Sequence, residues 1–137
     1  MARIYVVDDD ADVRHVVIYS LMDLGHDIAM YRDGETALEA LLADPPDLLI
    51  LDVMMPGHDG YEILQQAHSW GLQETTRTIV LSARASDVDR KRALDLGADL
   101  FMCKPFDPER LEKATRELLE VSTDELRQRR ESRASLS

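Results

Sequence analysis

The stretch IYVVDDDADVR, residues 4–14, decides the first unit of the fold because four apolar residues run directly into three aspartates. A short apolar run rich in β-branched residues is typical of a buried strand. Apolar residues then recur at helical spacing from Val13 to Leu24, and Gly25 supplies the stop that commonly ends a helix. The stretch therefore predicts a strand followed by a helix, with the aspartates at the turn between them.

The same alternation of strand and helix continues along the chain. The predicted strands are residues 3–7, 27–31, 47–51, 78–81 and 99–103, and the further predicted helices are residues 34–43, 60–69, 86–97 and 107–120. Parallel strands need crossover connections, so the pattern predicts an α/β protein with a doubly wound parallel sheet, covered by helices on both faces. In open sheets of this kind, ligands bind beyond the carboxyl ends of the strands.

Length and composition indicate one globular domain. The 137 residues, 45% of them apolar, suffice for a single core. The 16 basic and 27 acidic residues give a net charge of −11, which repels phosphate backbones and anionic lipid, so we expect no direct nucleic acid binding and no membrane binding. The sole cysteine is Cys103, and no apolar run is long enough to span a bilayer. These features predict a cytoplasmic protein.

The C-terminal residues differ from the rest in composition. Residues 121–137 are polar and basic, and Ser122 and Glu125 have the spacing of a capping box that could start one short basic helix. The arginines of this segment are Arg127, Arg129, Arg130 and Arg133. We expect a solvated or fraying end, or a linker, rather than a specific binding patch.

Polar side chains follow the predicted strands. Asp8 and Asp9 follow the first strand, Asp52 the third, Ser82 the fourth and Lys104 the fifth. Because the carboxyl ends of parallel strands meet at one edge of a sheet, we expect these side chains to lie together. Mg2+ takes oxygen ligands from a few carboxylates, and it would relieve the repulsion among three of them. The sequence therefore predicts a Mg2+ site at this edge.

The hydroxyl and the ammonium of this set indicate a second ligand, a phosphoryl group. Ser82 and Lys104 can bind its peripheral oxygens, and Lys104 can offset the charge that develops during transfer. Asp52 is then a candidate nucleophile, because carboxylates form acyl phosphates. Asp10, together with Asp12, is instead expected to cap the following helix and to complement its dipole.

Several motifs resemble, in order and approximate spacing, the CheY-like receiver domain of two-component response regulators. They are VVDDD at residues 6–10, LLILDVMMPGHDGYEIL at 48–64, IVLSARA at 79–85 and GADLFMCKPF at 97–106. The resemblance covers residues 3–120. It implies a flavodoxin-like fold with five helices and a five-stranded parallel sheet of order 2-1-3-4-5. A receiver domain over residues 1–120 and a C-terminal tail over residues 121–137 follow from it.

The resemblance also implies a role for each residue at the sheet edge. Asp52 matches the phosphoacceptor, Lys104 the phosphate-binding lysine, and Ser82 and Phe101 the pair that switches with the phosphoryl group. The bond between Lys104 and Pro105 is expected to be cis. The implied Mg2+ ligands are Asp8, Asp9, Asp52 and the backbone carbonyl of Met54.

The resemblance implies partners as well. A sensor histidine kinase or a phosphotransfer protein would supply the phosphoryl group, and the downstream effector is not identifiable from the sequence. The chain would assist only its own phosphorylation and dephosphorylation, as a monomer or a phosphorylation-dependent homodimer. The helix at residues 86–97 carries only a thin apolar stripe, so it can move or receive a partner. Phe101 stands where many members have tyrosine, which removes a phenol hydrogen bond, and Ser82 stands where threonine is also common.

Two other functions fit part of the pattern. Haloacid-dehalogenase-like phosphatases also use an aspartate nucleophile and Mg2+, but their D-x-D-x-T/V motif would fall on Asp8, Asp10 and Asp12, and the last is the wrong residue type. A receiver-like scaffold that no longer takes phosphate is disfavoured, because every site position carries a competent group. Turnover of a phosphate ester would support the phosphatase, and failure to bind Mg2+ would support the scaffold.

Overall fold

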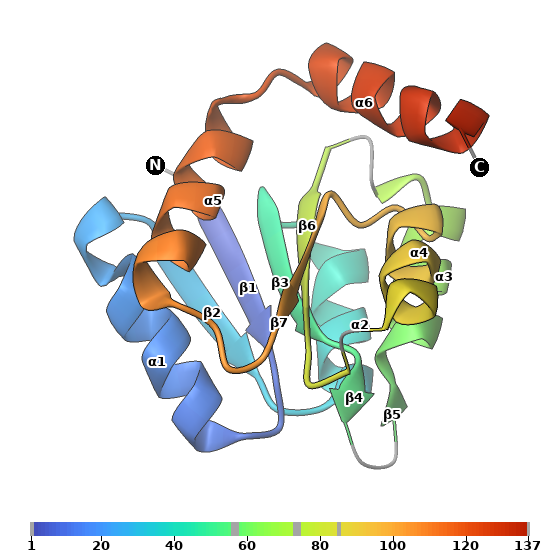
Figure 1. Ribbon diagram of the computed structural model, residues 1–137. Helices are drawn as coiled ribbons and strands as arrows, with labels where there is room; N and C mark the ends of the chain where they lie inside the picture. The colour runs from blue at the N-terminus through green and yellow to red at the C-terminus, as the bar shows by residue number, and fades with distance from the viewer. Residues whose placement is uncertain (1, 56–57, 73–74, 85, 137) are drawn as a thin grey trace.

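The computed structural model describes residues 2–55, 58–72, 75–84 and 86–136. Strands and helices alternate along most of this length (Figure 1). Their bounds are β1 Arg3–Val7, α1 Ala11–Leu21, the 3-10 helix η1 Met22–Leu24, β2 Asp27–Tyr31, α2 Gly34–Ala43, β3 Leu48–Asp52, β4 Met54–Met55, β5 His58–Asp59, α3 Gly60–Ser69, β6 Arg77–Ser82, α4 Asp87–Asp95, β7 Leu100–Cys103, α5 Pro108–Glu120 and α6 Thr123–Leu136.

The main sheet has five parallel strands in the order β2-β1-β3-β6-β7. Numbered among themselves, these strands have the order 2-1-3-4-5, so the predicted fold class is confirmed. The register pairs Val7 with Leu51, Asp52 with Leu81 and Ser82 with Cys103. The carboxyl ends of β1, β3, β6 and β7 therefore lie side by side. A small antiparallel hairpin, β4 with β5, was not predicted.

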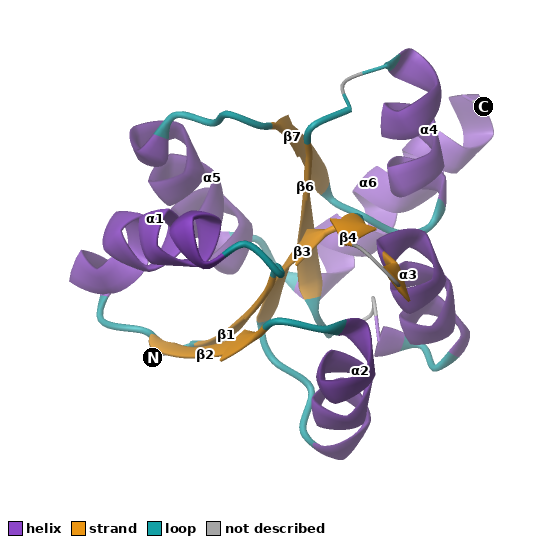
Figure 2. Ribbon diagram, turned by 90° about the horizontal axis from the view of Figure 1, so that it is seen from below, coloured by secondary structure: helices purple, strands orange, loops and turns teal. Residues whose placement is uncertain are grey.

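Helices cover both faces of the sheet. Figure 2 shows α1 and α5 on one face and α2, α3 and α4 on the other. Alternate residues of each strand point to opposite faces, so Ile4 and Val6 join the core beneath α1 and α5, while Tyr5 and Val7 join the core beneath the other three helices. Two apolar cores result, which explains why β3 is buried along its whole length.

Aspartates cap the first turns of α1 and α5. Asp10 caps α1 by accepting the backbone N–H of Asp12 at 2.9 Å, as predicted. Asp107 caps α5 in the same way, and Pro108 occupies the first turn, where its missing N–H costs no hydrogen bond. Gly25, with φ of 75°, follows the 3-10 turn that ends the first helical segment. These caps set the angle at which each helix leaves the sheet edge.

The helix after β6 is shorter than predicted and weakly anchored. It spans Asp87–Asp95 rather than residues 86–97, because Ser86 serves as its cap and Leu96 leaves the helical conformation. Ala93 is its one fully buried residue, and Val88 is 78% exposed. The thin apolar stripe read from the sequence is therefore present in the structure.

The C-terminal residues form α6 instead of a solvated or fraying end. Leu126 is 1% exposed and joins the core beneath α1 and α5. Figure 1 shows α6 crossing the amino ends of the strands, at the opposite end of the sheet from β4 and β5. The capping-box prediction is confirmed in part, since the Ser122 hydroxyl accepts the N–H of Glu125 at 3.2 Å. In the described part of the chain, no helix is both long enough and apolar enough to cross a membrane.

Candidate functional site

The polar residues predicted at the sheet edge meet there. Asp8 directly follows β1, Asp52 and Ser82 are the last residues of β3 and β6, and Lys104 directly follows β7. Asp8, Asp52 and Ser82 are each at most 3% exposed, whereas Asp9 is exposed. Buried acids and hydroxyls are costly without partners, so their placement together makes this edge the candidate functional site.

Lys104 connects the two buried acids. Its Nζ lies 2.9 Å from Oδ2 of Asp8 and 3.1 Å from Oδ2 of Asp52. The backbone N–H of Lys104 donates to the Ser82 carbonyl at 2.8 Å, and the peptide bond to Pro105 is cis, as the resemblance implied. The lysine is thus positioned by both its backbone and its ammonium group.

Backbone groups orient the two acids. Asp8 Oδ1 accepts the N–H of Asp10 at 2.9 Å, and Asp52 Oδ1 accepts the N–H of Met54 at 2.9 Å. Each carboxylate thereby turns its other oxygen toward Lys104. A nucleophile held in one orientation needs little reorganisation before it reacts.

Burial and charge shape the acid–base properties of the site. Desolvation raises the pKa of Asp8, because burial penalises its charged form more than the hydrogen bonds from Asp10 and Lys104 favour it. For Lys104, burial acts to lower the pKa, but the hydrogen bonds to Asp8 and Asp52 outweigh it and the pKa is raised. Lys104 therefore stays an ammonium, ready to bind an anionic oxygen.

The three acids of the edge fit a divalent cation. Asp8, Asp9 and Asp52 each offer a carboxylate oxygen, and these oxygens lie within 4.8 Å of one another. Hard oxygen donors from a few carboxylates are the ligands that Mg2+ takes in proteins. A divalent ion held by these oxygens would also relieve the repulsion among the three carboxylates, of which Lys104 contacts only Asp8 and Asp52.

The two proposed switch residues are enclosed. Ser82 is 0% exposed, and its hydroxyl oxygen accepts the N–H of Arg84 at 3.0 Å. Phe101 is 2% exposed, with the guanidinium carbon of Arg90 5.3 Å from its ring centre. The ring therefore points inward in this structure, covered by a cation from α4. The sequence gave no sign that Arg90 covers Phe101.

Gly60 has a structural role that was not apparent from the sequence. The structure shows a close approach at this position: a Cβ there would lie 2.3 Å from Cα of Val53 and 2.7 Å from the carbonyl oxygen of Asp52. Only glycine, which has no Cβ, allows the first residue of α3 to lie this close to the backbone of Asp52 and Val53. The sequence feature that could have indicated this contact is a glycine at the first position of the helix predicted after the third strand.

The geometry does not favour the phosphatase alternative. The second aspartate of its motif, Asp10, uses its side chain to cap α1. The acid best placed to act as a nucleophile, Asp52, ends the central strand β3 rather than the first strand. The acids at the sheet edge thus lie where the resemblance to a receiver, and not to such a phosphatase, would place them.

Comparison with known proteins gives the same class. The response regulator receiver domain family matches residues 4–116, so the chain belongs to that family, the signalling domain of two-component systems. Response regulator MprA of Mycolicibacterium vanbaalenii is 42% identical over 121 residues, covering 88% of this chain and 52% of that protein. The probable transcriptional regulator ycf27 of Porphyridium aerugineum is 38% identical over 118 residues, covering 85% and 48%. The chain spans about half the length of these relatives.

A solved structure supports the fold assignment. The BeF3-activated DrrB receiver domain is similar with a TM-score of 0.78 and 30% sequence identity, and the match covers 88% of this chain and 99% of that one. The family match ends at residue 116, before α6 begins. The helix α6 is therefore outside the matched receiver segment.

Proposed function

We propose that this chain accepts a phosphoryl group on Asp52 from a sensor histidine kinase or a phosphotransfer protein, with Mg2+ bound, and thereby switches a protein-binding surface. The observation that carries the proposal is the single ammonium of Lys104 bridging buried Asp8 and Asp52 at the sheet edge. A structural ion pair would need one acid, whereas a phosphoryl site needs a nucleophile, a cation and metal ligands together.

The transfer step follows from these positions. An oxygen of Asp52 attacks the phosphorus, and the bond from phosphorus to the donor's imidazole nitrogen breaks. The electron pair stays on that nitrogen, and the donor histidine, protonated on its other ring nitrogen, leaves as a neutral imidazole. Lys104 Nζ moves from the two carboxylates to an oxygen of the phosphoryl group, and the Ser82 hydroxyl binds another. Asp8, Asp9, Asp52 and the Met54 carbonyl would hold Mg2+, which when bound offsets the negative charge of the transferring group.

A groove beside the site fits the phosphodonor. It has a volume of about 440 Å3 and lies next to Lys104, and its other lining residues are Asp12, Val13, Val16, Ala83, Pro105 and Phe106. The lining is mostly apolar, and Val16 is 40% exposed. An amphipathic helix of the donor, with its histidine near Lys104, would cover this groove and exclude water from the transfer.

The proposed output starts from Ser82 and Phe101. Movement of Ser82 toward the phosphoryl group leaves space behind it, and Phe101 can respond by changing its position relative to Arg90. The surface formed by α4, β7 and α5 would change as a result, since α4 is held by little buried area. The occupant of that surface would be an effector protein or a second copy of the chain.

The net charge of −11 argues against direct nucleic acid binding by this chain. One relative is called a probable transcriptional regulator and is about twice as long, so any nucleic acid contact is proposed to belong to a further segment of such a protein. A cytoplasmic location fits the phosphodonors proposed.

A small phosphodonor tests the proposal. The chain is incubated with acetyl phosphate and Mg2+, and its intact mass is measured. We expect the mass of one phosphoryl group to appear in the wild type and in Asp10→Asn, whose side chain only caps α1, and to be absent in Asp52→Asn and in samples treated with EDTA. Full labelling of Asp52→Asn would reject Asp52 as the acceptor, and steady release of phosphate from a generic phosphate ester would point to the phosphatase instead.

A further inference from the structure

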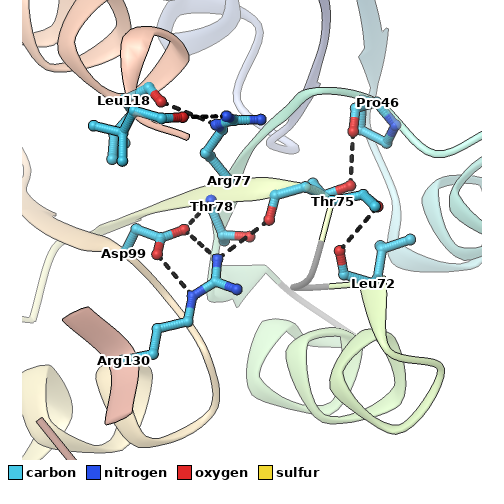
Figure 3. Close-up of polar contacts among 10 residues, drawn as sticks. Pro46, Leu72, Thr75, Arg77, Thr78, Asp99, Leu118 and Arg130 are labelled. Atoms are coloured by element: carbon cyan, nitrogen blue, oxygen red, sulfur yellow. Dashed lines mark hydrogen bonds and ion pairs between the residues drawn. The ribbon is translucent and has the colours of Figure 1, made fainter. Parts of the chain in front are cut away.

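The helix α6 is tied to the sheet by a buried ion pair. Arg130 donates from Nε to Oδ1 of Asp99 at 2.9 Å and from Nη2 to Oδ2 at 2.7 Å (Figure 3). The Asp99 side chain is 2% exposed and that of Arg130 is 15% exposed. A two-point contact of this kind fixes both distance and orientation, unlike an exposed pair at a helix surface.

The same carboxylate joins two strands. The backbone N–H of Thr78 in β6 donates to Oδ2 of Asp99 at 2.9 Å, and the N–H of Asp99, just before β7, donates to the Thr78 carbonyl at 2.8 Å. Asp99 therefore holds the amino ends of β6 and β7 together while it binds α6.

A second arginine secures the connection between α5 and α6. Arg77, at the start of β6, donates from Nε to the Leu118 carbonyl at 2.9 Å and from Nη2 to the Val121 carbonyl (Figure 3). The end of α5 and the residue that leads into α6 are thereby held on β6. Because the side chain of Leu126 in α6 is buried in the core, α6 is held by an apolar contact as well as by the ion pair of Arg130 with Asp99.

The strands held by this cluster are those that carry the switch residues. β6 ends at Ser82, and β7 contains Phe101 and leads into Lys104. The bidentate contact between Arg130 and Asp99 depends on both distance and orientation, so a shift of β7 relative to β6 would worsen it.

We propose that Asp99 and Arg130 form a latch that docks α6 on the amino ends of β6 and β7, and that phosphorylation at the other end of the sheet shifts these strands relative to each other and loosens it. This inference rests on the proposed function of Asp52. Coupling between two sites is reciprocal, so release of α6 also favours the phosphorylated state. The helix α6, outside the matched receiver segment, thereby becomes an output element of the domain.

Hydrogen exchange followed by mass spectrometry tests the latch. Backbone exchange over residues 124–132 is measured with and without acetyl phosphate and Mg2+, and the intact mass records phosphoryl uptake in the same samples. We expect exchange there to become at least about fivefold faster in phosphorylated wild type, the lower end of typical allosteric coupling. Asp52→Asn should show no change under the same treatment.

Two arginine variants separate the latch from general surface charge. Arg130→Met removes the contact with Asp99, while Arg129→Met removes only the exposed pair with Glu125, in which both side chains are 52% exposed. We expect Arg130→Met to show fast exchange in α6 before any phosphorylation, and to reach a higher phosphorylated fraction at limiting acetyl phosphate. Arg129→Met should behave as wild type in both measurements.

The outcomes distinguish the two proposals. Phosphoryl uptake without any change in α6 exchange overturns the latch and leaves the proposed function standing. Absence of uptake by mass rejects the proposed function and, with it, the release of α6 on phosphorylation. Unchanged exchange near Ser82 and Phe101 in Arg130→Met also overturns the latch, because coupling between the two ends of the sheet is reciprocal.

Discussion

Replacing Gly60 by alanine tests whether the close contact between α3 and β3 supports both the fold and the site. The added Cβ would lie 2.3 Å from Cα of Val53, against at least 3.4 Å in an ordinary contact, so the two segments must separate by 3.4 − 2.3 = 1.1 Å. The atoms it meets are backbone atoms, which cannot rotate away. The whole of α3 has to move, together with its buried side chains Tyr61, Ile63 and Leu64.

The expected loss of stability is at the upper end of the range for overpacking, about 3 kcal/mol. For a chain of this length, that corresponds to a melting temperature lower by roughly 10 °C, which thermal unfolding followed by circular dichroism can measure. We expect phosphoryl uptake to slow as well, because the same Cβ would press on the carbonyl of Asp52 at 2.7 Å.

Gly71→Ala is the matched control. Gly71 has φ of +74° and open space where a Cβ would stand, so alanine there meets only backbone strain of about 1 kcal/mol. We expect its melting temperature to fall by about a third as much, with phosphoryl uptake unchanged. A Gly60→Ala protein that melts no lower than Gly71→Ala would refute the reasoning about close contact.

Three further outcomes are expected. Asp9→Ala should weaken Mg2+ binding in calorimetry more than Asp10→Ala, which removes a helix cap, and equal affinities would contradict this assignment. Met54→Asn combined with Arg84→Glu should shorten the half-life of the aspartyl phosphate roughly tenfold, which corresponds to about 1.4 kcal/mol of barrier. The introduced asparagine and glutamate can orient the attacking water, whereas the native methionine and arginine exclude it. An unchanged half-life would show that both side chains face solvent. Burial raises the pKa of the Tyr31 hydroxyl, so the native state binds the phenolic proton more tightly than the unfolded state. The free energy of unfolding should therefore decrease as pH rises from about 10 through the raised pKa of Tyr31. Urea unfolding of Tyr31→Phe should lack that decrease.

The alternation of elements and the identity of the edge residues were predictable from the sequence. Apolar periodicity and capping residues act over a few positions, so the strands, the caps at Asp10 and Asp107, and the parallel sheet could be read locally. Since strands of a parallel sheet end at a common edge, the residue after each run also located Asp8, Asp52, Ser82 and Lys104.

Tertiary structure alone decided the contacts between positions far apart in the chain. Lys104 lies 96 residues from Asp8, and Arg130 lies 31 residues from Asp99, so no local pattern pairs them. The arginines near the C-terminus looked like a solvated basic tail because composition does not distinguish an arginine in water from one that meets a buried carboxylate. The close approach of Gly60 to Val53 was likewise not visible in the sequence, because it exists only after α3 packs on β3. Local propensities act along the chain, whereas these contacts form only when the sheet brings distant segments together.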